Sequence, residues 1–204
     1  NVLSGYAIET QYDRLLVAPQ RLREGLLERI EREAEHARAG RPSGIKFKAN
    51  SMVDEGIIDA LYRASQVGVP VDVWVRGICA IRAGVPGLSE NIRARSILGR
   101  YLEHSRIYSF ENDGDPEVYI GSADLMHRNL NRRIEVLVRL ADRDHFSRIE
   151  RLWDLAFSDD GSAWHLLEDG TWQRRERDDE GRILPALQDL VFADRAEARP
   201  RGSR

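Results

Sequence analysis

The fold is decided by residues 45–75, which read IKFKANSMVDEGIIDALYRASQVGVPVDVWV. Alternation of apolar and polar residues over 45–49 predicts a strand, and the nearly continuous β-branched run at 71–75 predicts a second one. Between them Asp54 can cap a helix whose apolar residues recur with helical spacing, and Gly68 ends that helix. The segment therefore predicts a strand–helix–strand unit, which favours parallel pairing of its two strands.

Segments on both sides of this unit continue the alternation of strand and helix. Leu15-Leu16-Val17 predicts a strand that ends at Pro19, and residues 20–38 predict a helix. A stretch rich in Gly and Pro, residues 82–87, predicts a functional loop or lid. Downstream, the patterns predict strands at 93–97, 107–110, 118–121 and 134–140, a helix at 144–157, a hairpin around Asp169-Gly170 and a last helix from about Ile183 to Ala193. The early strand–helix order predicts a largely parallel sheet with helices on its faces, in one domain.

Composition narrows the classes of function. The 204 residues are 42% hydrophobic and 32% charged, which is the balance of a globular α/β domain rather than of a disordered chain. The net charge of −3 provides no global field that would hold nucleic acid or an acidic membrane, so any anion site must be local. Because the chain has a single cysteine, Cys79, it can form neither a disulfide framework nor a zinc site built from cysteines. Because no membrane span or signal peptide is recognisable, the predicted location is cytoplasmic.

The first candidate for chemistry is Arg76-Gly77, directly after the predicted strand at 71–75. In an open α/β sheet, ligand crevices form at the carboxyl ends of strands. A guanidinium followed by a glycine that lets the backbone approach suits a phosphate at such a place. On position alone, a surface arginine at a strand end is the simpler interpretation.

The second candidate is His104, which lies just before an apolar strand and close in sequence to Arg106, Asn129 and Arg133. Arginines neutralise the charge on phosphoryl oxygens, and imidazole acts as nucleophile, acid or base near neutral pH. A hydrogen-bonding histidine at a strand start explains the same pattern equally well. No histidine pair has metal-ligand spacing, so no protein-built metal site is predicted. No Walker-type loop is present either, so arginines and Mg²⁺ would have to handle the phosphates of any bound nucleotide.

The segment around His104 resembles the signature of the phospholipase D superfamily. Arg106 stands where that signature has lysine, Glu111 where it has aspartate, and Gly121-Ser122-Ala123-Asp124 where it has Gly-Ser-x-Asn. The resemblance implies an α/β fold, a phospholipase D-like mixed β-sheet flanked by helices. The departures count against a standard phospholipase or nuclease.

A longer resemblance is to polyphosphate kinases of the histidine-phosphorylating type. It covers nearly the whole chain and rests on residues 15–19, 50–54, 75–79, 84–93, 101–106, 122–129 and 133–136. Agreement over so many ordered segments is more specific than any single motif. It implies that residues 1–194 form the C-terminal, phospholipase D-like domain of such an enzyme, with residues 195–204 as a flexible tail.

The resemblance also implies an activity: reversible transfer of the terminal phosphate of ATP to inorganic polyphosphate, with Mg²⁺, through a phosphohistidine. Arg76 matches an arginine that contacts nucleotide phosphates, His104 a second active-site histidine that binds ATP and assists proton transfer, and Arg133 an arginine lining the phosphate site. Arg106 and Asn129 are added from proximity alone. Implied partners are ATP/ADP, inorganic polyphosphate, upstream domains of the same enzyme and, at full length, further copies in a homo-oligomer.

Nothing before His104 resembles the segment that carries the phosphorylated histidine, so the chain is expected to be roughly the last third of a longer enzyme and to be inactive alone. Two alternatives stay open. One is a phospholipase D-type phosphodiesterase whose half-site is completed by dimerisation. The other is a non-catalytic module that binds polyphosphate or nucleotide, in which the arginines matter and His104 does not.

Overall fold

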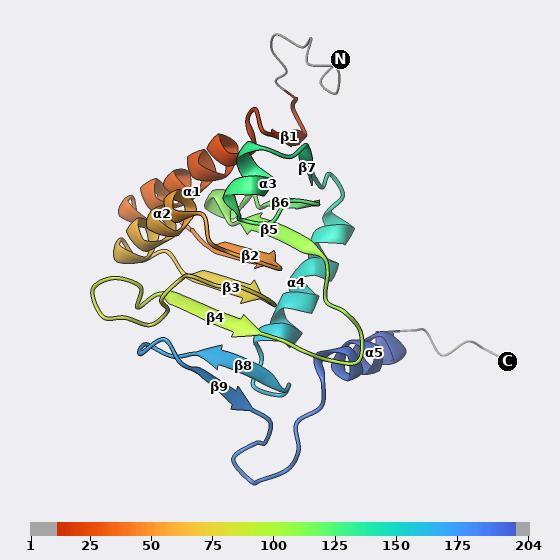
Figure 1. Cartoon of the computed structure of the whole chain (residues 1–204). Coiled ribbons are helices and arrows are strands. Elements are labelled where there is room, and N and C mark those ends of the chain that lie inside the picture. Colours follow the sequence, from red (N-terminus) through yellow and green to blue (C-terminus); the bar gives the residue numbers. More distant parts are fainter. Residues whose placement is uncertain (1–11, 199–204) are drawn as a thin grey trace, which may run out of the picture.

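A nine-stranded sheet forms the centre of the molecule (Figure 1) in the computed structural model, which describes residues 12–198. Its spatial order is β1-β7-β6-β5-β2-β3-β4-β8-β9. The strands are β1 Leu15–Ala18, β2 Ile45–Ala49, β3 Val71–Val75, β4 Ile92–Ser96, β5 Arg106–Phe110, β6 Glu117–Gly121, β7 Glu135–Arg139, β8 Ala163–Leu166 and β9 Trp172–Arg175. The predicted strand–helix–strand unit is present, with β2 and β3 as parallel neighbours.

The sheet is mixed, so the prediction of a largely parallel sheet is wrong. Within the described part of the chain, only the β2–β3 and β3–β4 pairs are parallel, and the other six pairs are antiparallel. The helix after β1 leads to β2 in the middle of the sheet rather than to a neighbour of β1. Short links such as those joining β5 to β6 and β8 to β9 permit only antiparallel pairing, because a parallel return needs a long crossover.

Helices cover both faces of the sheet. They are α1 Leu22–Arg38, α2 Glu55–Gln66, α3 His127–Asn131, α4 Arg143–Phe157 and α5 Leu187–Ala198, with a 3₁₀ turn at Asn112–Gly114. Figure 1 shows α1 and α2 on one face and α4 on the other. None of the helices that the structure describes combines the length and the apolar character needed to cross a bilayer.

Two apolar cores follow from this layering. The larger lies under α1 and α2, where the ring of Phe47 meets Tyr108 and Phe110 edge-on at centroid distances of 5.1 and 5.5 Å. The smaller lies under α4, where Trp153 meets Trp74 of β3 edge-on at 6.1 Å. Apart from the partly exposed Lys46, the side chains of β2 and β3 are therefore buried whichever face they point to, which is the usual condition of central strands.

The predicted helix cap at Asp54 is confirmed. Its Oδ1 accepts a hydrogen bond from the backbone N–H of Ile57 at 3.0 Å, which satisfies one of the free donors of the first turn of α2. The same carboxylate pairs with Arg23 of α1 at 3.0 Å. One side chain thus starts α2 and ties it to α1.

The last helix differs from its prediction. It runs over Leu187–Ala198 rather than from Ile183 to Ala193. Ile183 instead bridges to Arg177, and the N–H of Leu184 donates to the carbonyl of Glu176 at 2.9 Å, so this segment is extended. The helix includes the first four residues of the predicted tail at 195–204, and residues 199–204 lie outside the described residues.

The loop predicted as a lid, residues 82–87, lies away from His104. Gln66 at the carboxyl end of α2 donates to the carbonyl of Gly87 at 3.0 Å, which places this loop at the amino end of β3. It is held there by Ser89, whose Oγ accepts from the N–H of Val85 at 3.1 Å. This position does not support a lid over the carboxyl ends of the strands.

Gly121 at the end of β6 provides a stability test. A Cβ at this position would overlap the backbone carbonyl of Val136 and lie 2.9 Å from Cα of Leu137, so β7 would have to move. Replacing Gly121 by Ala should lower the free energy of unfolding by about 3 kcal/mol, measured by urea titration.

Gly44→Ala is the matched control. Its added Cβ would meet Glu111 Cβ at an ordinary 3.6 Å, so its effect on stability should stay within about 1 kcal/mol. Equal losses for the two variants would contradict the close approach at Gly121.

Candidate functional site

The predicted site residues lie along one edge of the sheet. The carboxyl ends of β2, β3 and β6 meet there with the amino ends of β5 and β7, as the pairing directions require. Arg76 follows β3, His104 precedes β5, Asp124 follows β6 and Arg133 precedes β7. Residues as distant in sequence as Arg76 and Arg133 are thereby brought to one side of the molecule.

Arg106 joins His104 to Asp124. Its Nη1 lies 2.9 Å from His104 Nδ1 and donates to the His104 carbonyl at 2.7 Å. Its Nη2 and Nε donate to the two Asp124 carboxylate oxygens at 3.0 and 3.2 Å. The same Nη1 also lies 3.3 Å from Nε2 of the ring. Because a guanidinium has only donors, a ring nitrogen of His104 can meet it only as an acceptor.

Asp124 is buried, yet it stays ionised. Burial acts to raise its pKa, but hydrogen bonds from Arg106 and from the Asn50 N–H, at 2.7 Å, outweigh burial and hold the pKa below its usual value. Tyr108 lies beside it and donates to the Ala123 carbonyl at 2.6 Å, and burial raises the pKa of this phenol. The base of the site therefore consists of a buried, fully paired arginine–aspartate unit.

Lys48 of β2 was missed by sequence reasoning. The residue is 1% exposed, and its Nζ donates to the Oγ and the carbonyl of Ser105 at 2.9 and 3.1 Å. It also lies 3.3 Å from Glu103 Oε2 and 4.3 Å from the centre of the Trp74 ring. Burial lowers the pKa of this ammonium, and Glu103 opposes the shift. A lysine inside a strand with helices on both sides was the available signal.

Arg76 and Arg133 are cations that lack protein partners within the described chain. Arg76 is partly exposed and Arg133 exposed, and neither guanidinium forms a hydrogen bond or ion pair with another residue among 12–198. Arg128 and Arg132, next to Arg133, are exposed in the same way. Arg76 and Arg133 are therefore free to bind an anion. Arg106, which was predicted to bind phosphate, contacts Asp124 and His104 instead.

Asn129 and Gly77 have structural roles at this edge. Buried Asn129 donates from Nδ2 to Glu135 Oε1 at 2.8 Å, so this N–H braces a carboxylate and is not available to a ligand. The Gly77 N–H donates to the Asn50 carbonyl at 2.7 Å, and a Cβ there would lie 2.8 Å from that oxygen. The close approach that glycine permits is therefore to protein backbone. A direct contact from Asn129 to phosphate stays a prediction.

The carboxylates of this edge are occupied. Asp124 pairs with Arg106, Glu103 with Lys48, and Glu135 with Asn129. Among residues 12–198 no three His, Cys, Asp or Glu side chains gather so that they could hold a metal ion. These residues do not fit a dedicated Mg²⁺ cage, which would need free oxygen ligands.

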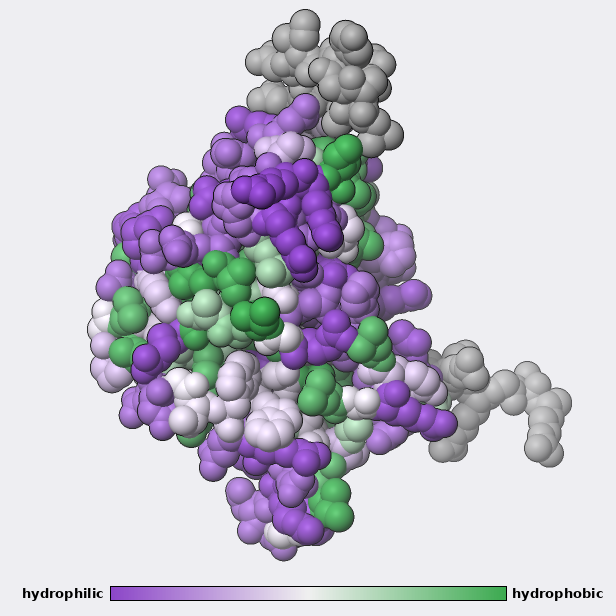
Figure 2. All heavy atoms as spheres, viewed as in Figure 1, coloured by the Kyte–Doolittle hydropathy of each residue, from purple (hydrophilic) through white to green (hydrophobic). Residues whose placement is uncertain are grey.

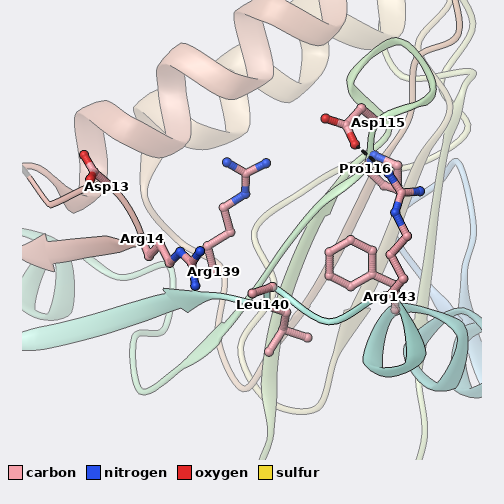
Figure 3. Close-up of a pocket in the computed structure, with 9 residues that line it drawn as sticks. Asp13, Arg14, Asp115, Pro116, Arg139, Leu140 and Arg143 are labelled. Carbon is pink, nitrogen blue, oxygen red and sulfur yellow. Dashed lines mark hydrogen bonds and ion pairs between the residues drawn. The ribbon is translucent and has the colours of Figure 1, made fainter.

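A cavity of about 460 Å³ lies at the other end of the sheet (Figure 3). Its charged side chains are largely paired with each other or with neighbours: Arg143 with Asp115 at 3.3 Å, and Arg139 with Glu117 at 3.6 Å. The lining residues are Asp13, Arg14, Asp115, Pro116, Arg139, Leu140, Ala141, Arg143 and Phe146. None of these nine is a predicted site residue, so the candidate site is an open edge and not this hollow.

Comparison with known proteins agrees with the long resemblance. A family model described as polyphosphate kinase C-terminal domain 2 matches residues 15–184. A polyphosphate kinase of Streptomyces coelicolor is 57% identical over 199 residues, which are 98% of this chain and 27% of the relative. The solved structure of the polyphosphate kinase from Porphyromonas gingivalis is 33% identical with a TM-score of 0.86, covering 96% of this chain and 30% of that one. The chain thus spans less than a third of the length of either protein.

The fold also matches a phospholipase D family member, Nuc from Salmonella typhimurium. The TM-score is 0.50 at 16% identity, over 79% of this chain and 96% of that one. At this identity the likeness shows the fold alone. The predicted phospholipase D-like mixed sheet flanked by helices is confirmed.

Asp124→Asn tests the buried pair through pH. Since the folded-state pKa of Asp124 is lowered, its contribution is present above the unfolded value of about 3.9 and is lost as pH falls through the folded value. The variant should be about 3 kcal/mol less stable than the parent at pH 7, because Arg106 loses its counterion. Urea titrations should show this gap narrowing toward pH 2.

Exposed Asp59 of α2 gives the control substitution, Asp59→Asn. The free energy of unfolding of this variant should stay close to that of the parent at both pH 7 and pH 2. If Asp124→Asn lowered the free energy of unfolding by the same amount at pH 7 and at pH 2, Asp124 would not be an ionised partner of Arg106.

Proposed function

The chain belongs to the polyphosphate kinase C-terminal domain family, and on that premise we propose that it supplies part of the site for reversible phosphoryl transfer between ATP and inorganic polyphosphate. In this proposal the phosphorylated histidine belongs to an upstream domain of a longer enzyme. The observation that carries the assignment is the row of arginines without partners among residues 12–198, at the edge where His104 lies.

The spacing of this row suits an extended polyanion. Arg76 follows β3 and Arg133 precedes β7, with β2, β5 and β6 between these strands. At about 4.8 Å per strand the two positions are separated by roughly 19 Å, and His104 lies between them. A single phosphate is too small to meet both arginines, whereas a nucleotide triphosphate or a polyphosphate chain presents anionic oxygens along its length.

Each residue then has a distinct task. Arg76 and Arg133 bind phosphate oxygens and neutralise the charge that develops during transfer. His104 contacts the reacting phosphates, and its orientation is set by Arg106 and Asp124. Because the carboxylates described at this edge are already paired, Mg²⁺ enters with ATP, held by the nucleotide phosphates.

The proposed reaction consists of two phosphoryl transfers. The bond from the γ-phosphorus of ATP to its bridging oxygen breaks as a bond forms to the upstream histidine nitrogen, and ADP leaves. The nitrogen–phosphorus bond then breaks as the terminal oxygen of polyphosphate bonds to the same phosphorus. Both steps run in reverse with ADP as acceptor.

Apolar side chains flank the charged residues. Ile78, Leu102 and Ile134 lie within two residues of Arg76, His104 and Arg133, and are 64, 72 and 54% exposed. Figure 2 shows hydrophobic patches separated by hydrophilic surface on the face in view. Together with the relatives' greater length, this edge fits a docking surface for an upstream domain that completes the site. The isolated chain is then expected to bind substrate weakly and not to turn over.

Two other functions remain testable. A phosphodiesterase would hydrolyse a phosphodiester in a His104-dependent manner, and its support here is limited to fold likeness. A non-catalytic anion-binding module would keep its polyphosphate affinity after His104→Ala. A homo-oligomer and a cytoplasmic location stay predictions.

The binding assignment is tested by calorimetric titration of the chain with Mg-ATP and with polyphosphate. Arg76→Ala and Arg133→Ala should each weaken polyphosphate binding about tenfold, because each removes a charge-assisted contact. His104→Ala should weaken Mg-ATP binding as well.

Arg14→Ala, which removes an exposed arginine at the far cavity, is the matched control and should leave both affinities unchanged. An equal loss in this control would mean that the affinity comes from overall charge and not from the edge. ATP-driven polyphosphate elongation by the 204-residue chain alone would overturn the need for an upstream domain.

A further inference from the structure

The segment that carries His104 has no regular secondary structure of its own. It links β4 to β5 over residues 97–105, and none of these residues belongs to a helix or a strand. The position of His104 therefore depends on side chains that hold its neighbours. Two of these neighbours, Glu103 and Ser105, are held from β2 by the ammonium of Lys48.

The same segment is held from a second side by α5. Gln188 Nε2 donates to Glu103 Oε1 at 2.7 Å and to the Tyr101 carbonyl at 3.2 Å. Gly99 packs directly on the Gln188 side chain, and a Cβ at Gly99 would lie 2.7 Å from Gln188 Cδ. The ring of Tyr101 meets Phe192 edge-on at 6.2 Å. Gln188 is 7% exposed, so its own side chain is enclosed by protein, whereas Tyr101 and Phe192 meet at the surface and are 52 and 53% exposed.

Helix α5 packs on the second core and also contacts α4. Leu187 is buried with Trp153 and Ala163, and Arg151 of α4 donates to Asp194 at 2.7 Å. The family model ends at residue 184, before α5 begins. A helix outside the matched region thus contacts both Tyr101 and Glu103, three residues and one residue before His104.

Glu103 is the point where these restraints meet. Its Oε2 faces Lys48 of β2 and its Oε1 faces Gln188 of α5, so each carboxylate oxygen is taken by a different element. We propose that Lys48, Glu103 and Gln188 form a positioning clamp that fixes His104 at the sheet edge. The role of His104 in phosphoryl transfer rests on the proposed function, whereas the clamp consists of contacts within this chain.

The electrostatics explain why the clamp would be rigid. A buried ammonium is costly unless it is paired and hydrogen-bonded, so Lys48 keeps Glu103 and Ser105 close. Gln188 then satisfies the other Glu103 oxygen with a neutral donor. Arg106 adds the last restraint on the His104 side, through its bond to the His104 carbonyl.

The test is hydrogen exchange of residues 97–105 together with NMR of the His104 ring, on the 204-residue chain. Gln188→Ala should speed exchange in 97–105 about tenfold and shift the His104 ring nitrogen signals, with amides outside this segment and α5 unchanged. Gln188→Glu, of the same size, places a carboxylate against Glu103 and should loosen the segment further than Ala. Glu197→Gln, at an exposed position of α5, is the control and should change neither readout.

Lys48→Met is an independent test of the clamp, because it removes the contacts that come from β2. It should produce the same local loosening, and if it fails to fold, the Gln188 variants still decide the question. Unchanged exchange and unchanged His104 signals in Gln188→Ala and Gln188→Glu would overturn the clamp. Titration with Mg-ATP in parallel separates the two proposals, because absence of binding by the parent chain counts against the proposed function and leaves the exchange result valid.

Discussion

The carboxylate of Asp124 accepts a backbone N–H from Asn50, 74 residues earlier in the chain, and a guanidinium from Arg106, 18 residues earlier. These bonds join the carboxyl end of β2, the amino end of β5 and the segment after β6 at one point. The charge is buried, so it is tolerated only because both oxygens are paired. The orientation of His104 depends on the same unit, since Arg106 is the residue that links the two.

Local patterns in the sequence predicted most elements, because periodicity and caps act over a few residues. The cap at Asp54 and the strands at 45–49 and 71–75 are where the patterns place them. Strand order could not be read in this way. Whether β1 pairs with β2 or with β7 is decided by packing over more than a hundred residues, and no local pattern encodes it.

The same division applies to the site. Arg76, His104 and Arg133 could be named because they match residues of the family that the chain resembles; position alone favoured a surface arginine for Arg76 and left His104 undecided. Their common edge follows from the sheet. The partners of Arg106 and Asn129 could not be foreseen, since proximity in sequence suggested a ligand where the fold supplies Asp124 and Glu135. Lys48 and Gln188 were missed because neither belongs to a motif; the place of Lys48 in a strand between helices was a signal that was not used, and Gln188 in a late helix offered none. Their importance appears only when distant elements meet.

The contact between Lys48 and Trp74 has an optical consequence. Trp74 has an ammonium 4.3 Å from its ring centre and the Trp153 ring centre at 6.1 Å, and it is buried, whereas Trp164 and Trp172 are partly exposed and the cation over Trp164 is more distant, at 6.0 Å. Intrinsic fluorescence excited at the indole band therefore contains a component that reports on the charge beneath His104. Trp74 thus serves as an intrinsic fluorescent probe beside Lys48, and no dye has to be attached there.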